Sequence, residues 1–225
     1  MPEADLHVHT FLSHSSAVSV EALADICRER KRAVVTVTDY GTIEGCRRLR
    51  ELLPGQFVMP GLELTSTAGG DFLVFSTDED YLASLPHPIE SVRQLRRDET
   101  TAVIWAHPRV SQRAKGWETP ELPEVQAVAP YVDGLEIYNG TMLGLVDEGL
   151  VHKTYFANLL RVSLDHSLAM TGGSDTHDAG MLFRCGTVFP SDVQDAANFV
   201  RAIKERRVAP VYDHEFFRFN ISLSG

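Results

Sequence analysis

The sequence has few cysteines and no long apolar run. Its three cysteines lie far apart, at Cys27, Cys46 and Cys185 of 225 residues, and no two form a CxxC pair. We therefore expect reduced, structural thiols rather than a disulfide framework. No apolar segment approaches the length of a membrane span, and the first residues do not resemble a signal peptide. These absences predict a soluble, cytoplasmic protein without a membrane partner.

Positive charge is also scarce. The chain has 21 lysines and arginines against 31 aspartates and glutamates, which gives a net charge of −10. Because no basic stripe is present to neutralise many phosphates, we expect no long nucleic acid as a partner. A small phosphorylated substrate stays compatible with this charge, since metal ions can reverse the field inside a cleft.

Low-complexity tracts, long charge runs and internal repeats are absent too. The apolar content of 44% is normal for a protein with a full core. Barrels of this length commonly form one domain, so we predict a single domain over residues 1–225.

Apolar, β-branched segments alternate with helical segments along the chain. The expected strands are 5–9, 33–39, 57–65, 71–76, 101–107, 134–139 and 168–173. The expected helices are 20–32, 43–53, 89–99, 144–164 and 192–207, with Ser19 capping the first and Ser191 with Gln194 opening the last. The proline-rich segment 108–130 suits a long loop over a site. This alternation predicts an α/β fold, either a parallel barrel or a doubly wound sheet.

The first expected strand carries histidines in an unusual pattern. In DLHVHT, Asp5, His7 and His9 alternate with Leu6 and Val8. Alternation places the three polar side chains on one face and the two apolar ones on the other. We expect Leu6 and Val8 to pack outward under the helices and the two histidines to point inward.

Metal-capable side chains recur where the later strands end. They are Asp39, Tyr40, Glu63, His107, Asp175 and His177. The carboxyl ends of parallel strands meet at one edge, which is where α/β enzymes hold their catalytic groups. A mixed histidine and carboxylate set without cysteine suits zinc, manganese or iron. A carboxylate such as Glu63 can bridge two metal ions, and two such neighbouring ions hold the phosphoryl group during hydrolysis.

Five motifs carry a family resemblance. DLHVHT, TD at 38–39, GLEL, AHPR and GGSDTH, in this order, resemble the motifs of the PHP (polymerase and histidinol phosphatase) metal-dependent phosphoesterases. The resemblance runs from Asp5 to about Tyr212. It implies a distorted (β/α)7 barrel with a metal centre at the C-terminal ends of the strands. It also implies two or three divalent transition-metal ions (zinc, manganese or iron) and phosphatase or nuclease activity.

The resemblance also implies roles for individual residues. His7, His9 and Asp175 resemble the ligands of a first metal, Glu63 the bridging carboxylate and His107 a ligand of a second metal. His14 and His177 resemble ligands of a third. The chain departs from the family pattern at Tyr40, which replaces a histidine, and at Asp71, which stands where GGH is usual; both are candidate ligands.

Three residues are candidate catalytic groups besides the ligands. Asp5 would orient a histidine, Arg109 would hold phosphate oxygens, and His177 is a candidate catalytic group as well as a candidate ligand of the third metal. Asn139 either lines the pocket or caps the turn after its strand. We predict hydrolysis of a small phosphomonoester, a nucleotide or a short oligonucleotide.

Two alternatives stay open. An amidohydrolase would use similar ligands on a C–N or C–O bond, although its usual bridging lysine has no counterpart at a strand end here. A degenerate, non-catalytic domain that binds a phosphorylated ligand is the other, because Tyr40 and Asp71 depart from the family pattern.

Overall fold

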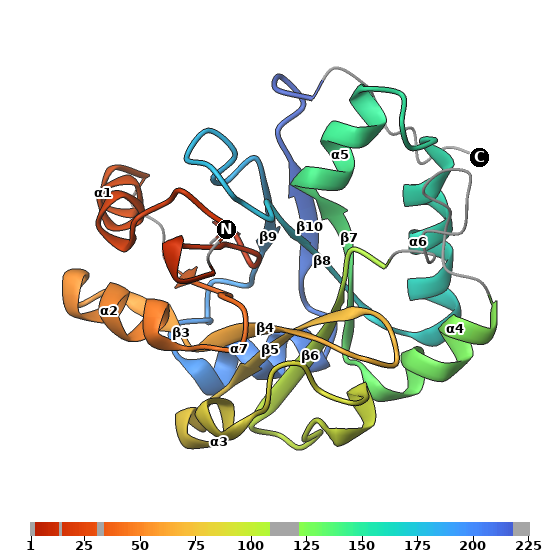
Figure 1. Cartoon of the computed structure of the whole chain (residues 1–225), viewed down its shortest axis with the longest axis horizontal. Helices are drawn as coiled ribbons and strands as arrows, with labels where there is room; N and C mark the ends of the chain where they lie inside the picture. Colours follow the sequence, from red (N-terminus) through yellow and green to blue (C-terminus); the bar gives the residue numbers. More distant parts are fainter. Residues whose placement is uncertain (1–2, 14, 31–33, 109–121, 218–225) are drawn as a thin grey trace.

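The predicted α/β class is confirmed. The computed structural model describes residues 3–13, 15–30, 34–108 and 122–217 (Figure 1). In this part of the chain the strands are β1 (Glu3–Ala4), β2 (Val34–Thr36), β3 (Phe57–Met59), β4 (Gly61–Thr65), β5 (Asp71–Ser76), β6 (Thr101–Ala106), β7 (Gly134–Asn139), β8 (Ala169–Gly173), β9 (Cys185–Val188) and β10 (Ala209–Tyr212). The α-helices are α1 (Val20–Arg30), α2 (Glu44–Leu52), α3 (Glu79–Ser84), α4 (Leu122–Val128), α5 (Gly140–Asp147), α6 (Thr154–His166) and α7 (Ala196–Lys204). Figure 1 shows α1 and α2 on one side of the strands and α5 and α6 on the other.

The main sheet has the strand order β4-β5-β6-β7-β8. Strands β6, β7 and β8 are parallel, whereas β5 is antiparallel to both of its neighbours. Strand β4 therefore runs in the same direction as β6. Because β5 is reversed, its first residue, Asp71, pairs with Ala106 at the end of β6. The reversed strand thus brings Asp71 to the edge where its neighbours end.

Strands β4 and β8 lie at the two sides of this sheet. Backbone hydrogen bonds connect them through the segments that follow β2 and β1. The segment after β1 is bonded to the segment after β2 through Thr38 N and Val8 O, which are 2.8 Å apart. The segment after β2 continues to β4 through Glu63 N and Asp39 O, at 3.2 Å. On the other side, Asp175 N, which follows β8, donates to His7 O at 2.8 Å.

The predicted (β/α)7 barrel stays a prediction. The strands assigned in the described residues form three sheets: the five-stranded one, β1-β9-β10 and β2-β3. The β1-β9-β10 sheet is antiparallel, and neither β9 nor β10 is among the strands expected from the sequence. Within the predicted strand 5–9 the structure has only an isolated bridge between Val8 and Thr176, and β1 ends before it, at Ala4.

Three of the predicted helices are wrong in extent. The segment 144–164 divides into α5 and α6, and Gly149 between them has a left-handed φ of 75°. The segment 89–99 forms only one 3₁₀ turn, Val92–Gln94, since the backbone N–H of Arg96 donates to the Tyr81 hydroxyl. The last helix begins at Ala196, where the Asp195 side chain accepts from Asn198 N; the capping role predicted for Ser191 is therefore incorrect.

The Ser19 cap is confirmed. Its hydroxyl accepts a hydrogen bond from Ala22 N at 3.1 Å, at the start of α1. Such a cap typically stabilises a helix by about 1 kcal/mol.

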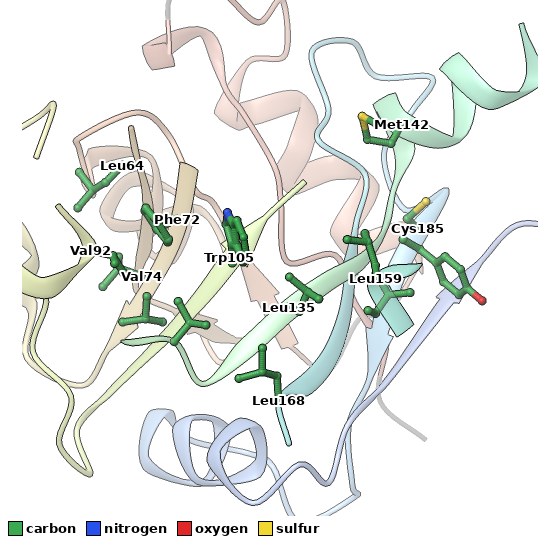
Figure 2. Packing of buried hydrophobic residues seen from close by; sticks show 14 of the residues in the cluster. Leu64, Phe72, Val74, Val92, Trp105, Leu135, Met142, Leu159, Leu168 and Cys185 are labelled. Carbon is green, nitrogen blue, oxygen red and sulfur yellow. The ribbon is translucent and has the colours of Figure 1, made fainter. Parts of the chain in front are cut away.

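Apolar side chains fill the space between the strands and the helices. Leu6 packs in one buried cluster with Phe199 of α7, and Val8 packs in another with Leu23 of α1, as the sequence predicts. A third cluster joins β4–β7 to α6, and Figure 2 shows Phe72, Trp105 and Leu135 within it. Fully burying a side chain of this kind contributes about 1.5–3 kcal/mol. This packing fixes the strands whose ends carry the polar residues.

The cysteines and helices agree with two expectations from composition. Cys27, Cys46 and Cys185 are buried free thiols. Among the described residues, no helix has the length and apolar character needed to cross a membrane.

Candidate metal centre

Buried histidines and carboxylates converge at the edge where β4, β6 and β8 end. Their side chains are at most 5% exposed. Two sets have ligand atoms close enough to hold an ion, within 4.8 Å of one another. We call His7, His9 and Asp175 the first group, and His7, Glu63 and His107 the second group. The structure therefore brings together the five residues for which the sequence indicates the first two metals.

In the first group, the ligand atoms face one another. His7 Nε2 and His9 Nε2 are 3.2 Å apart. Each lies 3.5 Å from Asp175 Oδ1. Glu63 Oε2 lies 3.0 Å from His7 Nε2 and 2.9 Å from His9 Nε2. Four potential ligand atoms thus surround one small space.

Hydrogen bonds at the opposite ring nitrogens orient both histidines. His7 Nδ1 lies 3.1 Å from Glu136 Oε1, an acceptor, so Nδ1 carries the proton. His9 Nδ1 lies 2.9 Å from Ser13 Oγ, whose own proton goes to Asp39 Oδ1 at 2.7 Å. His9 therefore also carries its proton on Nδ1. In the neutral rings, both Nε2 lone pairs point toward carboxylate oxygens, an arrangement that a bound cation would stabilise.

The second group is held less tightly. His107 Nε2 lies 3.3 Å from Glu63 Oε1, and that oxygen is buried without a hydrogen-bond partner. His107 Nδ1 is also buried without a partner, and the nearest carboxylate oxygen, Asp71 Oδ2, is 3.9 Å away. Buried polar atoms without partners are costly, so these atoms fit a site for a bound ion. The donor set of nitrogen and oxygen atoms without sulfur suits a divalent transition metal.

Two residues of the groups have a left-handed backbone. His107 has a φ of 22° and Asp175 a φ of 53°. Non-glycine residues in such conformations cost about 1–3 kcal/mol each, and they concentrate at functional sites. Each stands directly after a strand or one residue beyond it, where the turn aims the side chain back over the strand ends.

Mutual electrostatics shift the pKa values of the cluster. Burial alone would lower the pKa of His7, but the charges of Glu63, Asp175 and Glu136 outweigh it and raise the pKa well above its ordinary value. Conversely, burial would raise the pKa of Glu63, but His7 and the hydrogen bonds from the histidines hold it well below the ordinary value. The pKa of Asp175 is lowered in the same way. Glu63 and Asp175 therefore stay ionised, and their negative charge favours a bound cation.

Asp5 is buried next to the cluster and accepts hydrogen bonds from three backbone N–H groups. Its Oδ1 accepts from Ser174 N at 2.8 Å and from His7 N at 3.3 Å, and its Oδ2 accepts from Phe183 N at 2.9 Å. Burial raises its pKa to about 6 against these hydrogen bonds. Asp5 joins the backbone at His7 to the backbone just before Asp175.

Asp39 and Tyr40 surround His9 without joining either group. The Asp39 carboxylate accepts from Thr10 N, from Thr10 Oγ1 and from Ser13 Oγ, each at 2.7 Å. The Tyr40 ring stacks on His9 with centroids 4.6 Å apart. Burial and the charges of Glu63 and Asp175 raise the pKa of Tyr40 well above its ordinary value, so the hydroxyl stays protonated.

The remaining predicted residues lie at the rim or outside the described residues. The His177 ring is 4.8 Å from His9 between centroids and 38% exposed, and its Nδ1 lies 3.0 Å from Asp175 O. Arg184, which follows the GGSDTH motif, is paired with Asp213 at 2.6 Å. His14 and Arg109 lie outside the described residues.

Sequence reasoning assigned no role to Glu136 or Ser13. Glu136 is fully buried in β7, and an acidic residue within the apolar GLEIYN strand was the available signal. Ser13, four residues after His9, gave no such signal. Asn139 both caps α5, by accepting from Met142 N, and donates to Glu136 Oε2 at 3.0 Å.

The chain is similar to one family model and to several solved structures. Residues 160–208 match a family model described as PHP-associated. None of the curated proteins compared with the chain matches it. The fold is similar to that of PsfC from Pseudomonas syringae, with a TM-score of 0.69 and 20% identity over 96% of this chain and 93% of that one.

Two further structures share the fold. A two-domain protein from Bacteroides vulgatus containing a predicted PHP-like metal-dependent phosphoesterase gives a TM-score of 0.69 at 19% identity, over 95% of this chain and 65% of that one. Endonuclease Q, in complex with a 27-mer duplex that has an abasic lesion at the active site, gives 0.59 at 15% identity, over 91% of this chain and 56% of that one. The PHP-associated match and the fold shared with a PHP-like phosphoesterase together confirm the resemblance to the PHP family that the sequence motifs predict.

Proposed function

We propose that this protein is a metal-dependent hydrolase of phosphate esters. The observation that carries the proposal is the convergence of two oriented histidine Nε2 atoms with the buried carboxylates of Glu63 and Asp175. When bound, divalent ions polarise a phosphoryl oxygen and lower the pKa of water, which is the chemistry that phosphate ester hydrolysis requires.

The proposed ligands follow from the two groups. His7, His9 and Asp175 would hold one ion, and His107 would hold a second. Glu63 would bridge them, because its two oxygens face different groups. For Asp71, whose Oδ2 lies 3.9 Å from His107 Nδ1, we propose support of His107 at the edge of the second position in place of a ligand role. Zinc, manganese and iron all suit these donors.

Other residues would bind the substrate or support the ligands. His177 would contact the substrate at the rim or hold a third ion with His14. Arg109 would hold phosphate oxygens. For Asp39 and Tyr40 we propose support of His9 in place of the ligand roles that the sequence favours. Asp5 would hold the two ligand-bearing segments together.

The proposal includes the fold and the substrate class. Residues 1–225 would form one distorted (β/α)7 barrel, since backbone hydrogen bonds connect β4 and β8 through the segments after β2 and β1. The net charge of −10 supports a small phosphomonoester, a nucleotide or a short oligonucleotide. Because endonuclease Q is a fold relative bound to a duplex, the substrate panel should include duplex DNA. The buried free thiols support a reducing, cytoplasmic location.

Elemental analysis and a substrate screen on the same natively purified sample test the proposal. We expect at least one equivalent of transition metal and hydrolysis of a phosphomonoester or a short diester that a chelator abolishes. The panel should include lesion-containing duplex, lactones and amides. Faster turnover of amides or lactones would favour the amidohydrolase alternative, and metal-loaded protein inert on every ester would favour a binding domain.

A matched pair of variants links the activity to the site. Asp175→Asn removes one carboxylate charge from the first group, and Asp165→Asn removes one from the exposed surface of α6. We expect only the first to lose both metal and activity. Equal activity in both variants would contradict the assignment of the site.

A further inference from the structure

Glu136 is a buried carboxylate that lies in neither candidate group but contacts both His7 and His107. It is fully buried in β7 and is reached by no solvent. Oε1 lies 3.1 Å from His7 Nδ1, and Oε2 accepts from His107 N at 2.9 Å. One carboxylate therefore reaches a ring of the first group and the backbone of the second.

The two carboxylate oxygens of Glu136 form different hydrogen bonds. At Oε1, the hydrogen bond fixes the proton of His7 on Nδ1 and leaves Nε2 as the ligand atom. At Oε2, the bond holds the backbone of His107, whose φ of 22° is rarely adopted by a non-glycine residue. Asn139 donates a second hydrogen bond to the same oxygen, at 3.0 Å.

The surrounding backbone is shaped to allow these contacts. The pairing of β7 with β8 shifts register between Glu136 and Tyr138, an irregularity that re-aims side chains on the strand. Gly173, on β8, lies between Glu136 and His7. A Cβ at this position would stand 2.4 Å from His7 Cβ and 3.0 Å from Glu136 Oε1, so only glycine leaves room for the contact.

We propose that Glu136 is a positioning residue shared by the two ion positions, which sets His7 and His107 relative to each other. The stacked rings of these two histidines, 5.2 Å apart and inclined by 20°, agree with a common support. This inference rests on the proposed metal centre. Partners that orient a metal-binding histidine typically change metal affinity 10–100-fold when removed.

The test compares Glu136→Gln with wild type by cobalt titration. Glutamine keeps the shape, but its amide has one acceptor oxygen, so either His7 Nδ1 or the donors from His107 and Asn139 meet an NH₂ group. We expect binding of both cobalt ions to weaken about 10–100-fold, with altered visible absorption bands of the bound cobalt. Ser13→Ala should change the first ion alone, and Glu148→Gln, on the exposed end of α5, should change neither. Unchanged affinity and spectrum for either ion in Glu136→Gln would overturn the proposal.

A measurement on zinc-loaded wild type covers the case in which Glu136→Gln does not fold. Nitrogen-detected NMR of the histidine rings should show the His7 Nδ1 proton retained and protected from exchange. Zinc bound through His7 Nδ1 instead would overturn the inference. Failure of wild type to bind cobalt or zinc at all would overturn the proposed metal centre, an outcome distinct from an unaffected Glu136 variant.

Discussion

The first and second groups contain the same kinds of residue, but their histidines are supported differently. His9 is held at Nδ1 by Ser13, which is itself held by Asp39, and its ring is stacked on Tyr40. His107 Nδ1 is buried with no hydrogen-bond partner. Ligands that are fixed in advance lose less entropy when an ion binds. We therefore expect the first group to bind its ion more tightly and to fill before the second.

The largest expected effect is the loss of both ions in Glu63→Gln. Glu63 Oε2 faces His7 and His9 while its Oε1 faces His107, so the amide removes the shared negative charge and puts an NH₂ group toward a histidine. Affinity for both ions should fall by more than about 100-fold, beyond the range for an outer partner, and natively purified protein should lose its bound metal. Glu51→Gln, on the exposed face of α2, is the matched control. Retention of one ion at wild-type affinity would show that Glu63 serves one group only.

A smaller effect should separate the two groups. Ser13→Ala removes the acceptor for His9 Nδ1 and one donor to Asp39. Affinity for the first ion should fall about 10–100-fold, as measured by competition with a chelator, while the second ion is unaffected. Ser13→Thr keeps the hydroxyl and should restore binding. If Ser13→Ala weakens both ions equally, the proposed independence of the His9 support is wrong.

The residues that support the histidines, such as Ser13 and Glu136, were not predicted from the sequence, whereas the candidate ligands were. The candidate ligands His7, His9, Glu63, His107 and Asp175 could be proposed because each stands in or after a predicted strand within a short motif. Glu136 was missed because its role depends on β7 and β8 lying against the first segment, with Gly173 leaving the space. Local residues cannot show which strands become neighbours.

Strand direction and helix breaks were also beyond the sequence. The segment 71–76 reads as a strand in either direction, and its reversal follows from its pairing with β4 and β6. The apolar pattern of 144–164 continues through Gly149, so the break between α5 and α6 depends on a backbone conformation rather than on composition.

Metal binding should depend on pH with a defined sign. In metal-free protein, Glu63, Asp175 and Glu136 raise the pKa of His7 well above its ordinary value of 6.5 against burial, so the ring is protonated near neutral pH. An ion must displace this proton, so affinity for the first ion should rise about tenfold per pH unit for each proton released. Calorimetry in buffers of different ionisation enthalpy would count the protons. Affinity independent of pH between 6 and the raised pKa would contradict this.

The same shift predicts how the stability of metal-free protein changes. A raised folded-state pKa contributes stability that is complete below 6.5 and is lost as pH rises through the folded-state value. The melting temperature of chelator-treated protein should therefore fall as pH rises above neutral. Metal-loaded protein should not show this fall, because the ions replace the protons. Parallel curves would mean that the histidines are not the groups responsible.

The smallest effect should come from Asp71, at the edge of the second group. Its Oδ2 lies 3.9 Å from His107 Nδ1, and its side chain is 24% exposed, so water screens the contact. Asp71→Asn should weaken the second ion only about two- to fivefold, in the range of an exposed ion pair, and leave the first unchanged. Asp25→Asn, on the exposed face of α1, is the control. A loss of more than about 100-fold at the second ion would instead make Asp71 a direct ligand. The reversed β5 would then complete the second group, and the two positions would be equally well built.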